Sequence, residues 1–283
     1  MTDGPGPHPG VDISSPANPR IKHLVALRRR RAREQAGVTL VEGYAELDLT
    51  LSAGVRPHTL YCCPELVHGD PLRVTGRVAE LGGEIVQVSR PVFVKVAYRE
   101  SPDGWLAVVP VVDTDLARLE LGERPLLLVC EGVEKPGNLG AILRTADAAG
   151  LTAVIATDPV TDWGNANLVR ASKGAVFSVP VAAAPSGEVL PWLAGRGLSL
   201  VAATPDGTVL LGDADLTGPV AVAVGSETHG LSASWTAQAD VTVRIPMFGR
   251  ADSLNVAAAA AIVVYEAVRQ RTVRARRAGS PVR

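Results

Sequence analysis

The sequence has few cysteines and few aromatic residues, and each shortage excludes a class of protein. Three cysteines among 283 residues, Cys62, Cys63 and Cys130, are too few and too badly spaced for a disulfide framework or a four-ligand zinc site. We therefore expect no bound metal and a reducing, cytoplasmic location. Aromatic residues make up 4% of the chain, which argues against an extended platform that stacks nucleic-acid bases.

Long apolar segments are also missing. The longest apolar run, residues 256–264, is well short of the roughly 20 residues that a membrane-spanning helix needs. Residues 2–9 are rich in Gly and Pro, so residues 1–12 are predicted to be a disordered leader and not a signal peptide. With 47% hydrophobic residues, the chain has the side chains for a buried core and the length for two domains.

The net charge of -1 hides an uneven distribution, because basic residues gather near both ends. The first cluster is Arg20, Lys22, Arg28, Arg29, Arg30, Arg31 and Arg33, and the second is Arg269, Arg271, Arg274, Arg276 and Arg277. Such runs are typical of a solvated face or a flexible tail, and also of a surface that binds nucleic-acid phosphates. Charge alone does not decide between these interpretations.

Alternating helical and strand patterns divide the chain. Residues 13–112 are predicted to form a smaller α/β domain that begins with a basic helix over about residues 18–36. Residues 113–124 are charged and lack a strong apolar face, so they are the predicted linker. Residues 125–272 are the predicted second domain, and residues 273–283 a basic tail.

The second domain has the pattern of a doubly wound α/β sheet. Continuous apolar runs, typical of strands buried on both faces of a parallel sheet, occur at residues 126–130, 153–156, 198–203, 220–224 and 241–245. Helical stretches alternate with them at residues 139–149, 166–173, 188–195 and 254–271. Ligands of such folds bind beyond the carboxyl ends of the strands, and three polar clusters follow strands here.

The first cluster is Gly137-Asn138-Leu139-Gly140 with Arg144, between a strand and a helix. Helix-start amides at such a position can hold an anion. The segment lacks the Gly-Lys-Ser/Thr of a phosphate-binding loop and has only part of the dinucleotide fingerprint. Taken alone, Asn138 could simply cap the helix and Arg144 could pair with a surface carboxylate.

The other clusters are residues 225–230, with Gly225 and Glu227, and residues 245–255, which run from Ile245-Pro246-Met247 to Ser253-Leu254-Asn255. Glu227 could be an ordinary helix-start residue. His229 has no partner in the sequence and is interpreted as a structural loop residue. Ser253 and Asn255 could merely cap the last helix.

In this order and spacing the three clusters resemble the three motifs of the SpoU family of RNA ribose methyltransferases, in the SPOUT superfamily. The resemblance covers about residues 126–271, including Arg170-Ala171-Ser172-Lys173-Gly174-Ala175. Residues 18–22, the arginine run and residues 41–43 look like the substrate-binding domain that many members carry, which is similar to a ribosomal-protein fold. Glu134, Lys135 and Thr228 depart from the commonest family residues.

The resemblance implies a trefoil knot in the second domain, S-adenosylmethionine as cofactor, and a homodimer with the active site near its interface. Cofactor contacts carried over by the motifs are Gly225, Ile245 and Leu254. The polar catalytic set is Asn138, Arg144, Glu227, Ser253 and Asn255. Asn138 and Glu227 are expected to orient Arg144 and the loops, and Ser253 and Asn255 to shape the knot and contact the nucleotide or cofactor. The predicted RNA contacts are Arg20, Lys22, Arg28, Arg29, Arg30 and Arg31.

The resulting hypothesis is transfer of a methyl group to a ribose 2′-hydroxyl of structured RNA, with ribosomal RNA favoured by the basic first domain. A transfer RNA substrate is the alternative within the same chemistry. A non-catalytic RNA-binding or ribosome-assembly factor is disfavoured because every polar motif position is present. A dinucleotide-dependent oxidoreductase is disfavoured by the incomplete fingerprint and the lack of a clearly placed acidic ribose-binding residue.

Overall fold

The computed structural model describes residues 12–158 and 162–278. Within them the chain forms two compact units: residues 12–112 with 162–178, and residues 113–158 with 179–278. Each predicted domain was one continuous stretch, whereas residues 162–178 join the first unit here. Residues 1–11 of the predicted leader and 279–283 of the predicted tail lie outside the described residues.

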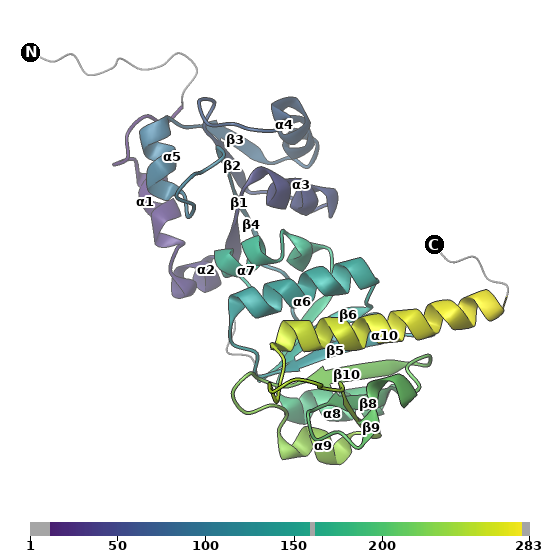
Figure 1. Ribbon diagram of the computed structural model, residues 1–283. Coiled ribbons are helices and arrows are strands. Elements are labelled where there is room, and N and C mark those ends of the chain that lie inside the picture. The colour runs from purple at the N-terminus through teal and green to yellow at the C-terminus, as the bar shows by residue number, and fades with distance from the viewer. Residues whose placement is uncertain (1–11, 159–161, 279–283) are drawn as a thin grey trace, which may run out of the picture. The chain divides into compact units, whose positions relative to one another are not determined.

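The first unit is built on a four-stranded mixed sheet (Figure 1). The strand order is β1-β4-β2-β3, in which β4 is antiparallel to β1 and β2, and β2 is parallel to β3. The strands are β1 (Val38–Glu42), β2 (Thr59–Cys62), β3 (Glu84–Gln87) and β4 (Trp105–Pro110). The helices are α1 (Pro19–Ala26), α2 (Arg30–Ala36), α3 (Tyr44–Ser52), α4 (Pro71–Glu80), α5 (Arg90–Val96) and α7 (Ala166–Ala171).

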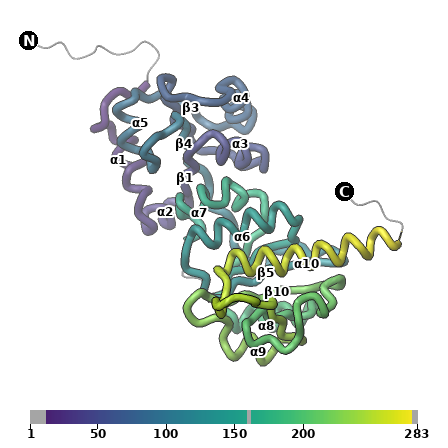
Figure 2. Tube along the Cα trace, viewed as in Figure 1, coloured from purple at the N-terminus to yellow at the C-terminus, as the bar shows by residue number. Residues whose placement is uncertain are grey.

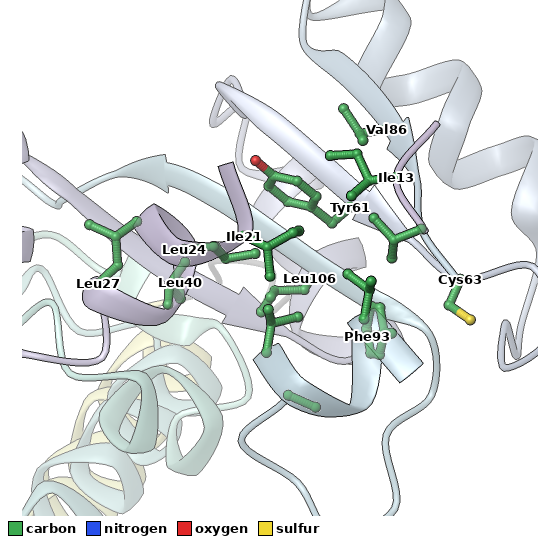
Figure 3. Packing of buried hydrophobic residues seen from close by; sticks show 14 of the residues in the cluster. Ile13, Ile21, Leu24, Leu27, Leu40, Tyr61, Cys63, Val86, Phe93 and Leu106 are labelled. Atoms are coloured by element: carbon green, nitrogen blue, oxygen red, sulfur yellow. The ribbon is translucent and has the colours of Figure 1, made fainter. Parts of the chain in front are cut away.

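An apolar core lies between α1, α5 and the sheet. Figure 3 shows members of this core, among them Ile21 and Leu24 from α1, Phe93 from α5 and Leu106 from β4. All four side chains are at most 2% exposed. Because side chains alternate along a strand, Val38 and Leu40 of β1 also belong to this core.

The prediction of a single helix over residues 18–36 is wrong in one respect, because this segment forms two helices, α1 and α2. Asn18 caps α1 by accepting the Arg20 N–H, and Arg29 has an extended backbone before α2. The break frees backbone carbonyls that a helix would have used. The buried Arg33 guanidinium donates to the carbonyl oxygens of Leu27 at 2.8 Å and Arg28 at 2.9 Å, which satisfies two of them.

Residues 162–178 are held in the first unit by polar contacts. The Arg33 guanidinium forms an ion pair with Asp162, and both side chains are largely buried. The Thr39 hydroxyl donates to the Gly164 carbonyl at 2.6 Å. Gly174 has a φ of 85°, and a Cβ there would lie 2.8 Å from the Glu46 carbonyl oxygen, so only glycine fits this approach.

The second unit contains a seven-stranded sheet of order β7-β6-β5-β10-β8-β11-β9. Every pairing in it is parallel, which confirms the predicted parallel α/β sheet. Its strands are β5 (Leu126–Glu131), β6 (Ala153–Thr157), β7 (Val181–Ala184), β8 (Ser199–Ala203), β9 (Val209–Leu210), β10 (Val220–Val224) and β11 (Val241–Arg244). Its helices are α6 (Pro136–Ala149), α8 (Ser186–Ala194), α9 (Ala233–Gln238) and α10 (Val256–Arg277).

Helices α6 and α10 pack against each other along the second unit (Figures 1 and 2). The sequence did not predict β7, β9 or α9, because these elements are short and their periodicity is weak. Helix α10 reaches Arg277, so five residues of the expected basic tail continue the helix. No helix in residues 12–158 and 162–278 combines the length and hydrophobicity that a membrane crossing requires.

Candidate active site

Three loops at the carboxyl ends of parallel strands carry the polar clusters of the second unit. Strand β5 leads into the first turn of α6, which holds Asn138, and β10 leads into residues 225–230. Strand β11 leads through residues 245–255 into α10. Because β5 and β10 are hydrogen-bonded neighbours with parallel register, the first two loops leave the same edge of the sheet.

Asn138 joins the three loops through its side-chain amide. Its Nδ2 donates to Glu227 Oε1, and its Oδ1 accepts from Asn255 Nδ2 at 3.2 Å. Eighty-nine residues separate Asn138 from Glu227, and 117 separate it from Asn255. The structure therefore brings together three of the five predicted catalytic side chains.

The orientation of each amide follows from its partners. Asn255 Oδ1 accepts the backbone N–H groups of Ala257 at 3.0 Å and Ala258 at 3.4 Å as the cap of α10. Its Nδ2 is then the group that faces Asn138, which must present its oxygen there and its nitrogen to Glu227. Asn255 thus caps the helix and also belongs to the polar cluster.

Gly225 shapes the loop that carries Glu227. A Cβ at position 225 would overlap the backbone of Gly230, so any larger residue must displace this backbone. The loop closes on itself, because the Gly230 N–H donates to the Ser226 carbonyl at 2.9 Å and the His229 N–H donates to Ser226 Oγ at 3.2 Å. Sequence reasoning missed this role of Ser226, although serine hydroxyls in turns often bond to backbone groups a few residues further along the chain.

Ser253 and Arg144 stand apart from the hydrogen bonds that join Asn138, Glu227 and Asn255. The Ser253 hydroxyl donates to Asp252 Oδ1 at 3.2 Å. Arg144 lies six residues after Asn138 in α6 and is exposed, and it makes no hydrogen bond or ion pair within residues 12–158 and 162–278. Asn138 and Glu227 bond to each other, and within the described residues neither forms a hydrogen bond with Arg144.

The predicted cofactor contacts come from the loops after β10 and β11. Gly225 and Ile245 are partly buried, and Leu254 is 39% exposed. Two further apolar side chains of residues 245–255, Met247 and Phe248, are 38% and 96% exposed. The loop that carries Asn255 therefore also presents accessible apolar side chains.

The predicted RNA contacts divide into two groups. Arg20 binds Glu84, Arg28 donates to the carbonyls of Lys95 and Ala97, and Arg30 pairs with Glu34. Three of the six predicted cations are therefore already bound to groups within the protein. Lys22, Arg29 and Arg31 are exposed and make no hydrogen bond or ion pair with any residue that the structure describes.

Comparisons with known proteins agree with this architecture. Residues 125–265 match the family model of the SpoU rRNA Methylase family, and residues 18–107 match the MRM3-like substrate binding domain. The 23S rRNA (uridine(2479)-2′-O)-methyltransferase of Streptomyces viridochromogenes is 34% identical, over 87% of this chain and 87% of its own. The 23S rRNA (guanosine(2553)-2′-O)-methyltransferase RlmP of Bacillus subtilis is 30% identical, over 89% of this chain and 97% of its own.

Solved structures show the same likeness. The AdoMet-bound rRNA methyltransferase from Sinorhizobium meliloti has a TM-score of 0.83 and 31% identity, covering 91% of this chain and 97% of that one. AviRb from Streptomyces viridochromogenes, in complex with AdoMet, has a TM-score of 0.81 and 33% identity, covering 90% of this chain and 100% of that one. The chain belongs to the SpoU rRNA methylase family, which confirms the resemblance of the three motifs. It is a two-part member, whose methylase region follows a substrate-binding domain of the MRM3-like type.

Proposed function

We propose that the protein is an S-adenosylmethionine-dependent RNA 2′-O-ribose methyltransferase whose substrate is ribosomal RNA. The observation that carries the proposal is the cluster of Asn138, Glu227 and Asn255, which joins all three family motifs through side-chain hydrogen bonds. Relatives that match 87% and 89% of this chain are named as 23S rRNA 2′-O-methyltransferases. This coverage supports ribosomal RNA over transfer RNA.

The residues present fit the cofactor. The loop of residues 245–255 offers accessible apolar side chains for an adenine ring, next to polar groups for the charged end of the molecule. Gly225, Ile245 and Leu254 would hold it. When bound, S-adenosylmethionine would supply a sulfonium methyl group that passes to the ribose 2′-oxygen, with the S–CH3 bond broken, S-adenosylhomocysteine as the leaving group and the 2′-hydroxyl proton released.

Arg144 binds the RNA phosphate next to the target ribose and stabilises the alkoxide that develops at its 2′-oxygen. A guanidinium stays protonated at neutral pH and is a poor base, so the proton passes to phosphate or water. The exposure of Arg144 and its lack of a partner among the described residues support this role. Replacing Arg144 by Lys keeps the charge and loses the forked donor geometry. Near-normal turnover of Arg144→Lys would contradict the assignment.

Asn138, Glu227 and Asn255 hold the three loops in register, and Ser253 contacts the nucleotide or cofactor from the third loop. This division of labour predicts that Asn138→Ala and Arg144→Ala still bind cofactor but do not transfer methyl groups. If both variants fail to fold, Asn138 and Arg144 have only a structural role.

The larger organisation belongs to the same proposal. We assign RNA binding to residues 13–112 and methyl transfer to residues 125–272, and the methylase region is threaded into a trefoil knot. The protein is a cytoplasmic homodimer. Exposed apolar residues on α10, Ile262 at 42% and Tyr265 at 48%, support a partner surface there, and three buried, free cysteines support a reducing compartment.

A labelled-methyl assay tests the proposed function. Purified protein, S-adenosylmethionine with a tritiated methyl group, and transcripts of 23S rRNA or transfer RNA are incubated, and the product is mapped for 2′-O-methylation. We expect label at one nucleotide of 23S rRNA, and calorimetric binding of S-adenosylmethionine but not of NAD. Cofactor binding without transfer to any ribosomal or transfer RNA would favour a non-catalytic assembly factor.

A further inference from the structure

The first unit contains a cavity that the proposed function does not use. It has a volume of about 560 Å³ and opens between helices α1 and α2 and the sheet. This volume is within the range of about 300–1,000 Å³ typical of small-molecule sites. The residues that line it are Pro19, Arg20, His23, Leu24, Leu27, Ala36, Val38, His58, Thr59, Tyr61 and Val108.

The floor of the cavity is apolar and contains one aromatic ring. Leu24 of α1, Leu27 directly after α1 and Tyr61 of β2 are at most 5% exposed and belong to the core shown in Figure 3, so they present only a narrow part of their surface to the cavity. Val38 and Val108 add to the floor from β1 and β4. A surface of this kind favours a flat, largely apolar group.

Arg20 forms one wall and is held in place. Its guanidinium lies 5.8 Å from the centre of the Tyr61 ring and donates two hydrogen bonds to Glu84, at 2.9 and 2.5 Å. The same pair lowers the pKa of the Glu84 carboxyl through the hydrogen bond from Arg20. The Glu84 carboxyl therefore stays ionised, and its negative charge is compensated by the positive charge of Arg20.

The rim of the cavity is polar and its surroundings are cationic. His23 and His58 are exposed, and Thr59 is partly exposed. Imidazole groups can donate and accept hydrogen bonds, and the Thr59 hydroxyl, which donates to Glu84 Oε2 at 3.2 Å, can accept one. Lys22 on α1 and Arg31 on α2, the two helices that wall the cavity, have no ion-pair partner among the described residues.

We propose that this cavity takes one unpaired nucleobase of the RNA substrate. The base lies on the apolar floor beside Tyr61, its polar edge bonds to His23, His58 and Thr59, and Lys22 and Arg31 bind the adjoining phosphates. Sequence-specific RNA recognition mostly uses bases in loops and bulges, which can be splayed out and stacked on an aromatic ring or a guanidinium. The inference rests on the proposed function, because it assigns the site at which that enzyme selects its RNA.

A plugged cavity tests the inference, with a neighbouring residue as the matched control. Ala36 is exposed, ends α2 and lines the cavity, whereas Gln35 is exposed in the same helix and does not. We expect Ala36→Trp to raise KM for a 23S rRNA transcript at least tenfold, with kcat within twofold and S-adenosylmethionine affinity unchanged. Gln35→Trp is expected to match the wild type.

A second measurement examines the base itself. We expect the wild type to bind ten-nucleotide single strands of A, C, G or U with affinities that differ at least fivefold, and a His23→Ala, His58→Ala double variant to lose that difference. Thermal unfolding shows whether each variant is folded.

Equal KM values for Ala36→Trp and Gln35→Trp, or a base preference that the double variant retains, would overturn the cavity assignment. A wild-type protein that neither binds S-adenosylmethionine nor methylates RNA would instead overturn the proposed function. If bases bind in the cavity but methyl transfer fails, the cavity assignment stands and the proposed function is wrong.

Discussion

At the residue scale, the site depends on individual residues whose chemistry or size few other residues could replace. Asn138 donates to one loop and accepts from another, a combination that neither an acid nor an aliphatic residue provides. Gly225 is required for a different reason, since the backbone of Gly230 occupies the space of a Cβ.

Replacing Asn138 by Asp keeps its shape but removes the NH2 donor and places a carboxylate against Glu227. We expect methyl transfer to fall by about 10²-fold at neutral pH, the order of loss that misplacement by about 1 Å causes. Two adjacent carboxylates raise the pKa of one of them, and the protonated acid can donate again. Activity relative to wild type should therefore recover in part as the pH falls toward about 5. A ratio that stays flat with pH would contradict this account.

Replacing Gly225 by Ala should lower the free energy of unfolding by about 1–3 kcal/mol, because the added methyl group has no room and the loop backbone must move. Affinity for S-adenosylmethionine should fall with it. Gly187 is the matched control, since nothing lies within 4 Å of a Cβ built there. Urea unfolding and calorimetry measure both effects, and equal results for the two alanine variants would refute the steric argument.

At the element scale, the N-terminus of α10 serves both folding and the site. Asn255 accepts two backbone N–H groups of this helix while its amide nitrogen reaches Asn138. Capping accounts for a moderate amount of stability, and the contact with Asn138 accounts for the position of the third loop relative to the first.

These two functions can be separated by substitution. Asn255→Ala removes both and should lower the free energy of unfolding by about 1 kcal/mol and reduce transfer. Asn255→Ser retains a capping oxygen but has no amide donor, so it should unfold like the wild type and still lose transfer. Chemical denaturation and the labelled-methyl assay decide the outcome. Full activity in Asn255→Ser would show that only the cap matters.

At the scale of the whole molecule, RNA affinity depends less on the total number of basic side chains than on how many of them lack a partner within the protein. Arg20, Arg28 and Arg30 bind groups within the protein, whereas Lys22, Arg29 and Arg31 are exposed without a partner among the described residues. Counterion release depends on the phosphates that a protein neutralises, so we assign RNA affinity to the second group.

Changing Lys22, Arg29 and Arg31 together to Gln should weaken RNA binding and flatten its salt dependence. Each lost phosphate contact reduces the slope of log K against log salt by about 0.7 for single strands and about 0.9 for a duplex, so the total change is about 2–3. Filter binding of a 23S rRNA transcript over a range of KCl concentrations measures this slope.

The control for that experiment removes the same charge from the same unit. It changes three arginines that already pair with carboxylates, namely Arg30, Arg73 and Arg77. Their replacement by Gln should alter the slope much less. Equal slopes for the two triple variants would show that total charge, and not the unpaired cations, determines affinity.

Local pattern was enough to predict most of the architecture. Apolar runs such as residues 126–130 and 220–224 became the buried parallel strands β5 and β10, because burial on both faces of a sheet requires continuous apolar side chains. The short elements β7, β9 and α9 were not predicted. β7 is Val-Ala-Ala-Ala, a sequence whose strand form comes from pairing with β6.

The sequence by itself determined the family, the strand order along the chain and the residue types at the site, because these depend on local periodicity and on motif chemistry. Only the tertiary structure decided which side chains meet. It joined Asn138 to Glu227 and Asn255, left Arg144 outside that cluster, and placed residues 162–178 with the first unit. Contacts across about a hundred residues arise from chain topology and packing, and no local pattern encodes them.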